Sequence, residues 1–217
     1  MRVNFTEAVA TRRLLCRPYR AAYVPTYHGW MQDPWLRAAT ASDALTLEQE
    51  YAAQRGWVDD DDKLTFIFFD AEAAAAAGAA GAGAPAATAG MAGDANLFIL
   101  DAAAARDEYW PGGAGRGGVA EVMVMVGEPR MRRRGYAREA VIALMRYGAE
   151  RLGVRGFVAK IAADNAASRA LFASLGFREA KAVPAFDEVH CVREWADGDF
   201  AAHDFAVVHD EPPAGEA

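Results

Sequence analysis

The chain has few cysteines, no long apolar segment and no excess of positive charge. Its two cysteines, Cys16 and Cys191, lie far apart, and neither belongs to a CxxC pair or a Cys/His spacing. This excludes a disulfide framework and a zinc site as interpretations, so we expect reduced thiols and no metal. No window reaches the ~18 apolar residues of a membrane helix, and the first twenty residues lack the apolar core of a signal peptide. We expect a soluble, cytoplasmic protein.

The charge balance bears on the choice of partners. Over 217 residues, 23 Lys and Arg stand against 30 Asp and Glu, giving a formal net charge of −7. Nucleic acids and anionic membranes both select a basic face. The composition therefore argues against either of them as a general partner, and any basic site has to be local.

Three stretches contain little that could form a core. Ala or Gly fills 19 of the 23 positions in 71–93, glycine is frequent near the end of 102–118, and 210–217 carries Pro-Pro and Glu. Such segments bury too little apolar surface to offset the entropy of ordering their backbone. We predict one domain over 1–209 with loop insertions at 71–93 and 102–118, followed by a disordered tail over 210–217.

The rest of the sequence alternates between strand-like and helix-like segments. Thr46 and Gln49 fit a capping box at the start of a helix. The nearly all-apolar run 119–126 is typical of a central strand covered on both faces. The Ala/Gly stretch before residue 96 is interpreted as an expanded hairpin loop. Strands are expected over 13–18, 64–70, 96–101, 119–126, 156–161, 186–195 and 205–208, and helices over 25–31, 47–55, 135–152 and 165–175.

The turn between the central strand and the long helix is rich in arginine. Glycine at Gly135 allows backbone N–H groups to converge there, and a helix N-terminus adds partial positive charge. Guanidinium groups suit phosphate oxygens. The pattern predicts a pyrophosphate site, with a solvated basic turn as the alternative. The arginines fall within nine residues: Arg130, Arg132, Arg133, Arg134 and Arg138.

Two motifs in this context resemble those of the GNAT acetyltransferases. Arg132-x-x-Gly135-x-Ala137 is similar to the (Q/R)xxGx(G/A) loop of that family, and the segment from Asn165 to Gly176-Phe177 resembles its closing signature. The stretches 25–30, 45–51, 94–97, 121–129 and 160–161 further resemble the N-acetyltransferase 9 subfamily. The resemblance implies an α/β fold with a mixed, splayed central sheet flanked by helices. It also implies that acetyl-CoA, as co-substrate, lies between the family's fourth and fifth strands, with no metal.

The resemblance assigns coenzyme contacts residue by residue. It implies that the strand residues offer backbone groups to the pantetheine arm and the thioester, that the loop cradles the pyrophosphate, and that the closing helix completes the site. The chain departs from the family pattern at Arg133, where glycine is frequent, and at Phe172, where the family carries a tyrosine acid. The cofactor-binding residues are Met123, Val124, Met125, Val126, Arg132, Arg133, Arg134, Gly135, Tyr136, Ala137, Asn165, Ser168 and Phe172.

Two residues are candidates for proton transfer. Glu121 is the only carboxylate inside the predicted strand 119–126, so it is the candidate base for the amine proton, acting through water; a solvent-facing strand-end Glu is the alternative. His190 is a second candidate acid or base, and a structural strand histidine is its alternative.

The resemblance implies an N-acetyltransferase that acetylates a protein or peptide amine by direct attack in a ternary complex, with tubulin as the implied substrate. An N-terminal amine titrates near ~8 and a lysine near ~10.4, so weak base machinery favours the N-terminal α-amine. One rival is a catalytically weak or inactive scaffold of the same fold acting on microtubules. Another is a small-molecule amine acetyltransferase.

Overall fold

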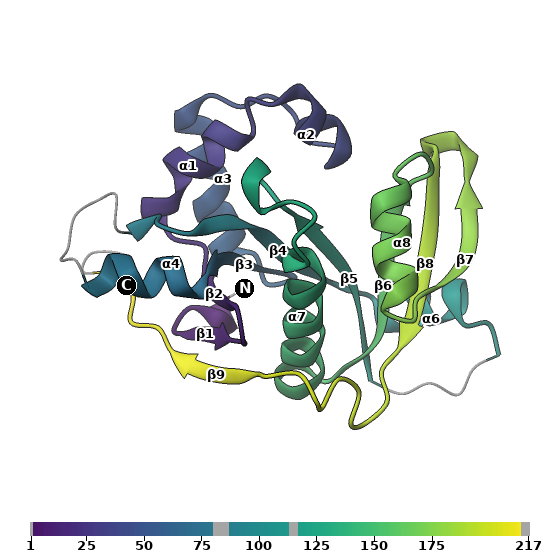
Figure 1. Ribbon diagram of the computed structural model, residues 1–217. Helices are drawn as coiled ribbons and strands as arrows, with labels where there is room; N and C mark the ends of the chain where they lie inside the picture. Colours follow the sequence, from purple (N-terminus) through teal and green to yellow (C-terminus); the bar gives the residue numbers. More distant parts are fainter. Residues whose placement is uncertain (1, 80–86, 113–116, 214–217) are drawn as a thin grey trace.

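The computed structural model describes residues 2–79, 87–112 and 117–213, and it is organised around one nine-stranded sheet (Figure 1). The strand order is β7-β8-β6-β5-β4-β3-β2-β1-β9. β5 and β6 run parallel and the other neighbouring strands run antiparallel, so the predicted mixed sheet is confirmed. The strands are β1 (Glu7–Ala10), β2 (Leu14–Pro18), β3 (Lys63–Asp70), β4 (Met91–Leu100), β5 (Gly118–Met125), β6 (Val154–Ala162), β7 (Arg178–Val183), β8 (Glu188–Glu194) and β9 (Ala206–His209).

Helices cover the two faces of the sheet. The long helix α7 packs on β2, β4, β5 and β6, while α3 packs on β3 and α1 packs on α3 (Figure 1). None of the described helices is long and apolar enough to cross a membrane. The α-helices are α1 (Val24–Trp30), α2 (Pro34–Ala39), α3 (Leu47–Asp59), α4 (Ala71–Ala79), α6 (Ala102–Tyr109), α7 (Tyr136–Leu152) and α8 (Ala166–Ser174), and the 3₁₀ turns are η1 (Arg2–Asn4), η2 (Ala21–Tyr23), η3 (Pro129–Met131) and η4 (Pro184–Phe186).

The helix ends follow the local signals of the sequence. The capping box at the start of α3 is formed, because the Thr46 hydroxyl accepts from the Gln49 N–H while the Gln49 side chain accepts from the Thr46 N–H. Gly153 ends α7 in the left-handed region at φ 68°, where a side chain would be strained. Local capping residues of this kind, Thr46, Gly135 and Asn165, explain why the predicted starts of α3, α7 and α8 agree with the structure to within one residue.

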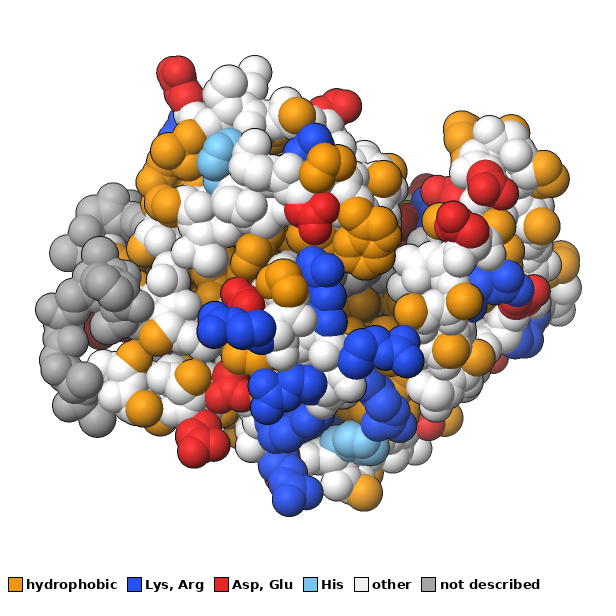
Figure 2. Space-filling model, turned by 45° about the horizontal axis from the view of Figure 1, so that its top comes forward, with side chains coloured by type: hydrophobic (Ala, Val, Ile, Leu, Met, Phe, Trp, Pro, Cys, Tyr) orange, Lys and Arg blue, Asp and Glu red, His pale blue; other side chains and the backbone are white. Residues whose placement is uncertain are grey.

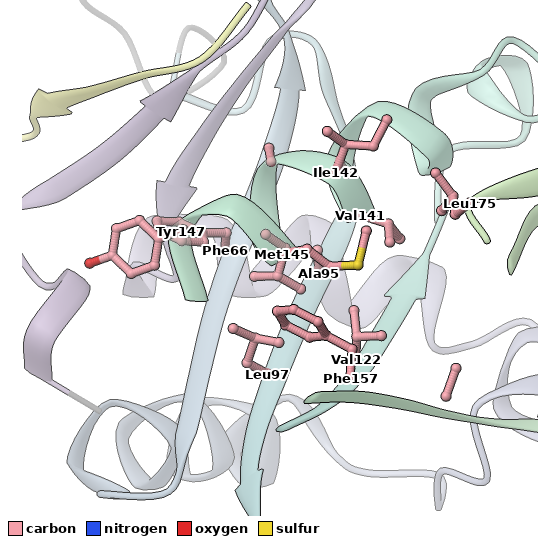
Figure 3. Packing of buried hydrophobic residues seen from close by; sticks show 14 of the residues in the cluster. Phe66, Ala95, Leu97, Val122, Val141, Ile142, Met145, Tyr147, Phe157 and Leu175 are labelled. Atoms are coloured by element: carbon pink, nitrogen blue, oxygen red, sulfur yellow. The ribbon is translucent and has the colours of Figure 1, made fainter. Parts of the chain in front are cut away.

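The main core lies between α7 and the centre of the sheet. Alternate residues of the strands, such as Phe66, Leu97 and Val122, point toward Met145 of α7 (Figure 3). A second cluster on the opposite face is aromatic: the Tyr19 and Tyr27 rings are 5.3 Å apart, centroid to centroid. Burying side chains of this size stabilises the fold by about 1.5–3 kcal/mol each. The two faces together fix the position of β4 and β5, which carry the site described below.

The predicted loops at 71–93 and 102–118 are wrong in part. The first begins with helix α4, and its last three residues already belong to β4. The second begins with α6, whose N-terminus is capped because the Asp101 carboxylate accepts from the Ala104 N–H at 2.8 Å. Alanine has the highest helix propensity of all residues, which explains both helices. Residues 80–86 and 113–116 lie outside the described part of the chain.

The first and the last of the described strands, β1 and β9, pair at one edge of the sheet. The predicted edge strand near 205–208 is confirmed as β9, which pairs with β1. Asp210, which the sequence analysis places in the tail, is instead buried and accepts a hydrogen bond from Arg17 Nε at 2.7 Å. The ordered chain therefore continues past β9, because a buried ion pair holds it; residues 214–217 lie outside the described part.

Candidate active site

Two connected cavities lie where β5 and β6 meet the helices α2 and α8. The larger, here called the loop cavity, has a volume of about 480 Å³ and follows the loop before α7. The smaller, here called the strand cavity, has a volume of about 230 Å³ and lies over β4, β5 and β6. Figure 2 shows Lys and Arg side chains gathered near a hollow on one face of the molecule. The two cavities share six lining residues: Ala39, Thr40, Val124, Met125, Asn165 and Ser168.

The loop cavity is lined at the N-terminus of α7 by a glycine whose backbone conformation favours glycine. Gly135 is the N-cap of α7 and adopts φ 82°, in the left-handed region. A Cβ at this position would come within 3.1 Å of an Arg13 guanidinium nitrogen. The free N–H groups of the first turn of α7 and the partial positive charge of the helix end favour an anion here.

The arginines of this loop have different tasks. Arg132 donates to the Val126 and Gly127 carbonyls at 3.1 and 3.2 Å, and its guanidinium lies 5.0 Å from the centre of the Trp35 ring. It therefore fixes the loop to the end of β5. Arg133 lines the loop cavity and adopts φ 61°, a conformation typical of the glycine frequent at this position in the family.

The other predicted loop residues are placed as follows. Tyr136 and Ala137 line the loop cavity, and the Tyr136 hydroxyl donates to the Asp70 carboxylate. Arg134 is not among the described residues that line the two cavities. Its backbone carbonyl accepts a hydrogen bond from Arg13 Nη1 at 2.9 Å. Arg138, in the first turn of α7, lines the loop cavity. Arg130 is also absent from the described lining of both cavities; its side chain is exposed and pairs with Glu128 at 2.9 Å. The structure thus brings most of the predicted residues, but not Arg130 and Arg134, to one concavity.

The start of α8 closes the junction between the two cavities. The Asn165 side-chain carbonyl caps the helix by accepting from the Ser168 N–H at 3.0 Å, which orients the amide N–H₂ as a donor for a ligand. Phe172 lines the strand cavity and packs on Phe177, with ring centroids 5.0 Å apart. The position therefore supplies apolar surface and no hydroxyl.

Strand β5 runs along both cavities. Met123 lines the strand cavity, Val126 lines the loop cavity just beyond the strand end, and Val124 and Met125 line both. The parallel pairing of β5 with β6 runs from the pair of Gly118 with Val154 to the pair of Glu121 with Val158, and the carboxyl-terminal part of β5 that follows lines the cavities. The structure brings all four predicted strand residues together at this edge.

The floor of the strand cavity is polar and was not predicted from the sequence. Asp94 and Asn96 of β4 line it, as does Lys63 of β3. Burial raises the pKa of the Asp94 carboxyl to about 6 and lowers the pKa of the Lys63 ammonium to about 8. The Lys63 ammonium lies 3.0 Å from the centre of the Trp57 ring. The polar positions 94 and 96 alternate with apolar ones, a strand signal that a longer predicted β4 would have revealed.

The two predicted proton-transfer residues lie outside the described lining of both cavities. The Glu121 carboxylate forms an ion pair with Lys160 Nζ at 2.6 Å, and Lys160 lines the strand cavity. His190 is buried on β8, with Nδ1 2.9 Å from the Tyr109 hydroxyl and Nε2 3.3 Å from the Glu188 carboxylate. The structure thus places Glu121 one residue away from the cavity and His190 in a separate polar cluster under α6.

Comparison with known proteins decides the family. The acetyltransferase (GNAT) domain family matches residues 13–178. The chain is a GNAT acetyltransferase. It is similar to alpha/beta-tubulin-N-acetyltransferase 9 of Drosophila melanogaster, with 38% identity over 191 residues and 87% coverage of both chains. These matches identify the chain as an N-acetyltransferase.

Solved structures show the same GNAT fold. A ribosomal L7/L12 alpha-N-protein acetyltransferase, RimL, superposes with a TM-score of 0.66 at 17% identity, covering 88% of this chain and 95% of its own. Spermidine N-acetyltransferase from Vibrio cholerae, in complex with CoA and spermine, superposes with a TM-score of 0.64 at 14% identity, covering 84% and 95%. In this GNAT chain, residues of β5, α7, β6 and α8 line the two cavities together with residues of α2, β3 and β4.

Proposed function

We propose that the chain is an acetyl-CoA-dependent protein N-acetyltransferase that modifies N-terminal α-amines, with tubulin chains among its acceptors. The observation that carries the proposal is the junction of the two cavities, because a coenzyme in one and an amine in the other meet at Val124 and Met125. The name of the Drosophila relative supports tubulin as the acceptor.

The loop cavity suits the pyrophosphate and the pantetheine arm of acetyl-CoA. Gly135 adopts the positive φ with which the loop turns into α7, and Arg133 and Arg138 line the same cavity. The Asn165 amide lies at the entrance to the strand cavity, where it can donate to a pantetheine carbonyl. The CoA bound in the spermidine N-acetyltransferase supports this use of the fold.

The reaction joins a neutral amine to the acetyl carbon. The amine nitrogen forms the new C–N bond, the C–S bond of the thioester breaks, and the coenzyme leaves as a thiolate that takes up one proton. A thiol has an ordinary pKa near ~8.5, so it leaves without a dedicated acid. This fits Phe172, whose side chain has no proton to give. The protein's task is to position the reactants and to handle the amine proton.

Glu121 remains the carboxylate proposed from the sequence as the base, acting through water. Its ion pair with Lys160 gives Glu121 a second task, which is to neutralise the Lys160 ammonium that faces the strand cavity. His190 remains the alternative proposed from the sequence, although its two ring nitrogens already face Tyr109 and Glu188.

One experiment tests the proposal. Purified protein is titrated calorimetrically with acetyl-CoA, and thiol release is then followed after adding N-terminal tubulin peptides with a free α-amine. The same peptides with a blocked N-terminus and one internal lysine serve as the control. We expect tight coenzyme binding and thiol release with the free α-amine alone. Binding without release from any peptide would favour the scaffold alternative, and release from small amines alone would contradict a protein acceptor.

A further inference from the structure

The strand cavity contains one carboxylate that the coenzyme site does not use. Asp94 lines this cavity and is 3% exposed. It belongs to the middle strand of the sheet, β4, and not to the neighbouring strand from which the candidate base was predicted. Burying a carboxylate without hydrogen-bond partners costs free energy, so the hydrogen bonds that Asp94 makes and lacks indicate its role.

One oxygen of this carboxylate is held and the other is not. The Thr65 hydroxyl lies 2.6 Å from the Asn96 side-chain carbonyl, to which it donates, and the Asn96 amide donates to Asp94 Oδ2 at 2.5 Å. This chain fixes the plane of the carboxylate. Asp94 Oδ1 is buried and has no hydrogen-bond donor among the described residues. A fixed, buried acceptor without a donor indicates a missing partner that carries N–H or O–H groups.

The position of Asp94 relative to the coenzyme site is set by strand pairing. Asp94 is the direct antiparallel partner of Met125, and Met125 lines both cavities. Directly paired residues on antiparallel strands have Cα atoms about 4.5–5.5 Å apart. A group bound at Asp94 Oδ1 therefore lies beside the end of β5, where the acetyl group of the coenzyme is proposed to sit.

We propose that Asp94 receives the ammonium group of the acceptor and takes its proton, so that Asp94, and not Glu121, is the catalytic residue of amine activation. This inference rests on the proposed function. In the step, one proton passes from the substrate nitrogen to Asp94 Oδ1, and an ammonium and a carboxylate become a neutral amine and a neutral carboxylic acid. The amine lone pair then forms the C–N bond, the C–S bond breaks, and the second nitrogen proton leaves with the coenzyme as its thiol. Asp94 returns its proton to water after the product departs.

The other charged side chains that line the described part of the strand cavity are two lysines, Lys63 and Lys160. The Lys160 ammonium is neutralised by Glu121 at 2.6 Å. The Lys63 ammonium lies against the Trp57 ring, burial lowers its pKa to about 8, and it interacts electrostatically with the Asp94 carboxylate, so an incoming ammonium shares Asp94 with Lys63. Asp94 is thus the carboxylate of the cavity lining that can pair with an incoming ammonium.

The test compares Asp94→Asn with the wild type on two matched peptides. The first has an N-terminal α-ammonium, and the second carries an aminooxy group at the same place, which is a nucleophile that is uncharged at neutral pH. Asparagine keeps the size and the acceptor for Asn96 but removes the charge and the proton-accepting ability. We expect Asp94→Asn to lower kcat/KM for the ammonium peptide by roughly 10²-fold, the range of general base catalysis. Acetyl-CoA affinity and turnover of the aminooxy peptide should change less than about threefold, because neither depends on a charge at position 94.

Three outcomes separate the possibilities. Equal losses on both peptides would assign Asp94 a structural role and overturn the inference. Full activity of Asp94→Asn on the ammonium peptide would overturn it too, while leaving the proposed function intact. No transfer by the wild type to any amine, despite coenzyme binding, would overturn the proposed function and this inference with it. Asp94→Glu, which keeps the charge on a longer arm, should recover part of the lost rate on the ammonium peptide.

Discussion

Asp94 and Met125 face each other across the β4–β5 ladder, so a buried carboxylate and the strand end that borders both cavities are direct neighbours. The arrangement ties the acceptor side of the site to the coenzyme side through backbone hydrogen bonds of the sheet. Side chains on paired strands are positioned more rigidly than those on loops, which suits a group that has to meet a reacting atom.

Replacing Gly135 should separate coenzyme binding from stability. Gly135→Ala places a Cβ near Arg13 at a positive φ, and we expect it to weaken acetyl-CoA affinity at least about tenfold and to destabilise the fold by about 1 kcal/mol. Gly153→Ala is the matched control, because Gly153 also has a positive φ but a Cβ there would meet no described residue other than its chain neighbours within 4 Å. It should cost a similar free energy of unfolding and leave the affinity unchanged. Calorimetric titration and urea unfolding measure both; equal affinities in the two variants would remove the loop from the coenzyme site.

Glu121 and Lys160 can be tested as a pair. Glu121→Gln leaves the Lys160 ammonium facing the strand cavity without its partner, so we expect a several-fold rise in KM for a cationic acceptor. Adding Lys160→Met to the same chain should restore KM, because the repelling charge is then gone. If Glu121 is instead the base, the double variant stays slow, and the loss is concentrated below about pH 8, where an α-amine is charged. Steady-state kinetics of the single and double variants across pH decide between the two roles.

The buried carboxyl of Asp94 should make stability depend on pH. Its pKa is raised from the ordinary 3.8 to about 6, so the folded chain binds more protons than the unfolded chain between these values. Stability of the wild type therefore falls as pH rises from about 4 to about 6, by about 2–3 kcal/mol from this group. Asp94→Asn lacks this contribution, and Lys63 stays protonated throughout the range. Urea unfolding should show that the free energy of unfolding of Asp94→Asn rises relative to that of the wild type as pH rises from about 4 to about 6. A difference in free energy of unfolding that does not change with pH would contradict the prediction.

Asp210 should contribute to stability out of proportion to its place near the end of the chain. Its carboxylate pairs with Arg17 Nη2 at 2.6 Å and with Arg20, whose side chain is 2% exposed. Asp210→Ala leaves the Arg20 charge buried without its partner, and we expect a loss of about 3 kcal/mol. Asp197→Ala is the control, because Asp197 pairs with Arg155 at the same 2.6 Å but is 89% exposed, and it should cost less than about 0.5 kcal/mol. Similar losses in thermal unfolding would show that burial does not distinguish the two pairs.

The parts of the fold that were predicted from the sequence have strong local signals. The helix α7 has a clear apolar period and glycines at both ends, and the loop before it carries the family motif. The strand β7 was not predicted, because its residues are mostly exposed and it exists through its pairing with β8. Short edge strands of this kind depend on tertiary contacts more than on propensity.

The candidate site was predicted in the same uneven way. The coenzyme residues follow from a contiguous motif, whereas Asp94 and Lys63 come together from different strands. The first three residues of β4, which precede Asp94, were assigned to the Ala/Gly stretch, so the strand alternation that would have placed Asp94 beside Asn96 was not recognised. Nothing in the local sequence around Lys63 indicates that it faces the same cavity.

The pairing of β1 with β9 joins two segments that are far apart in the sequence, so this part of the sheet forms late during synthesis. Glu7, near the start of the chain, is the ladder partner of His209, near its end. Until residues 206–209 have been synthesised, β1 lacks the partner strand with which it pairs in the folded protein, and unpaired edge strands are templates for aggregation. The sheet gains its final, four-residue edge when β9 emerges. Nascent chains that stall before this point should need chaperone protection that the finished protein does not.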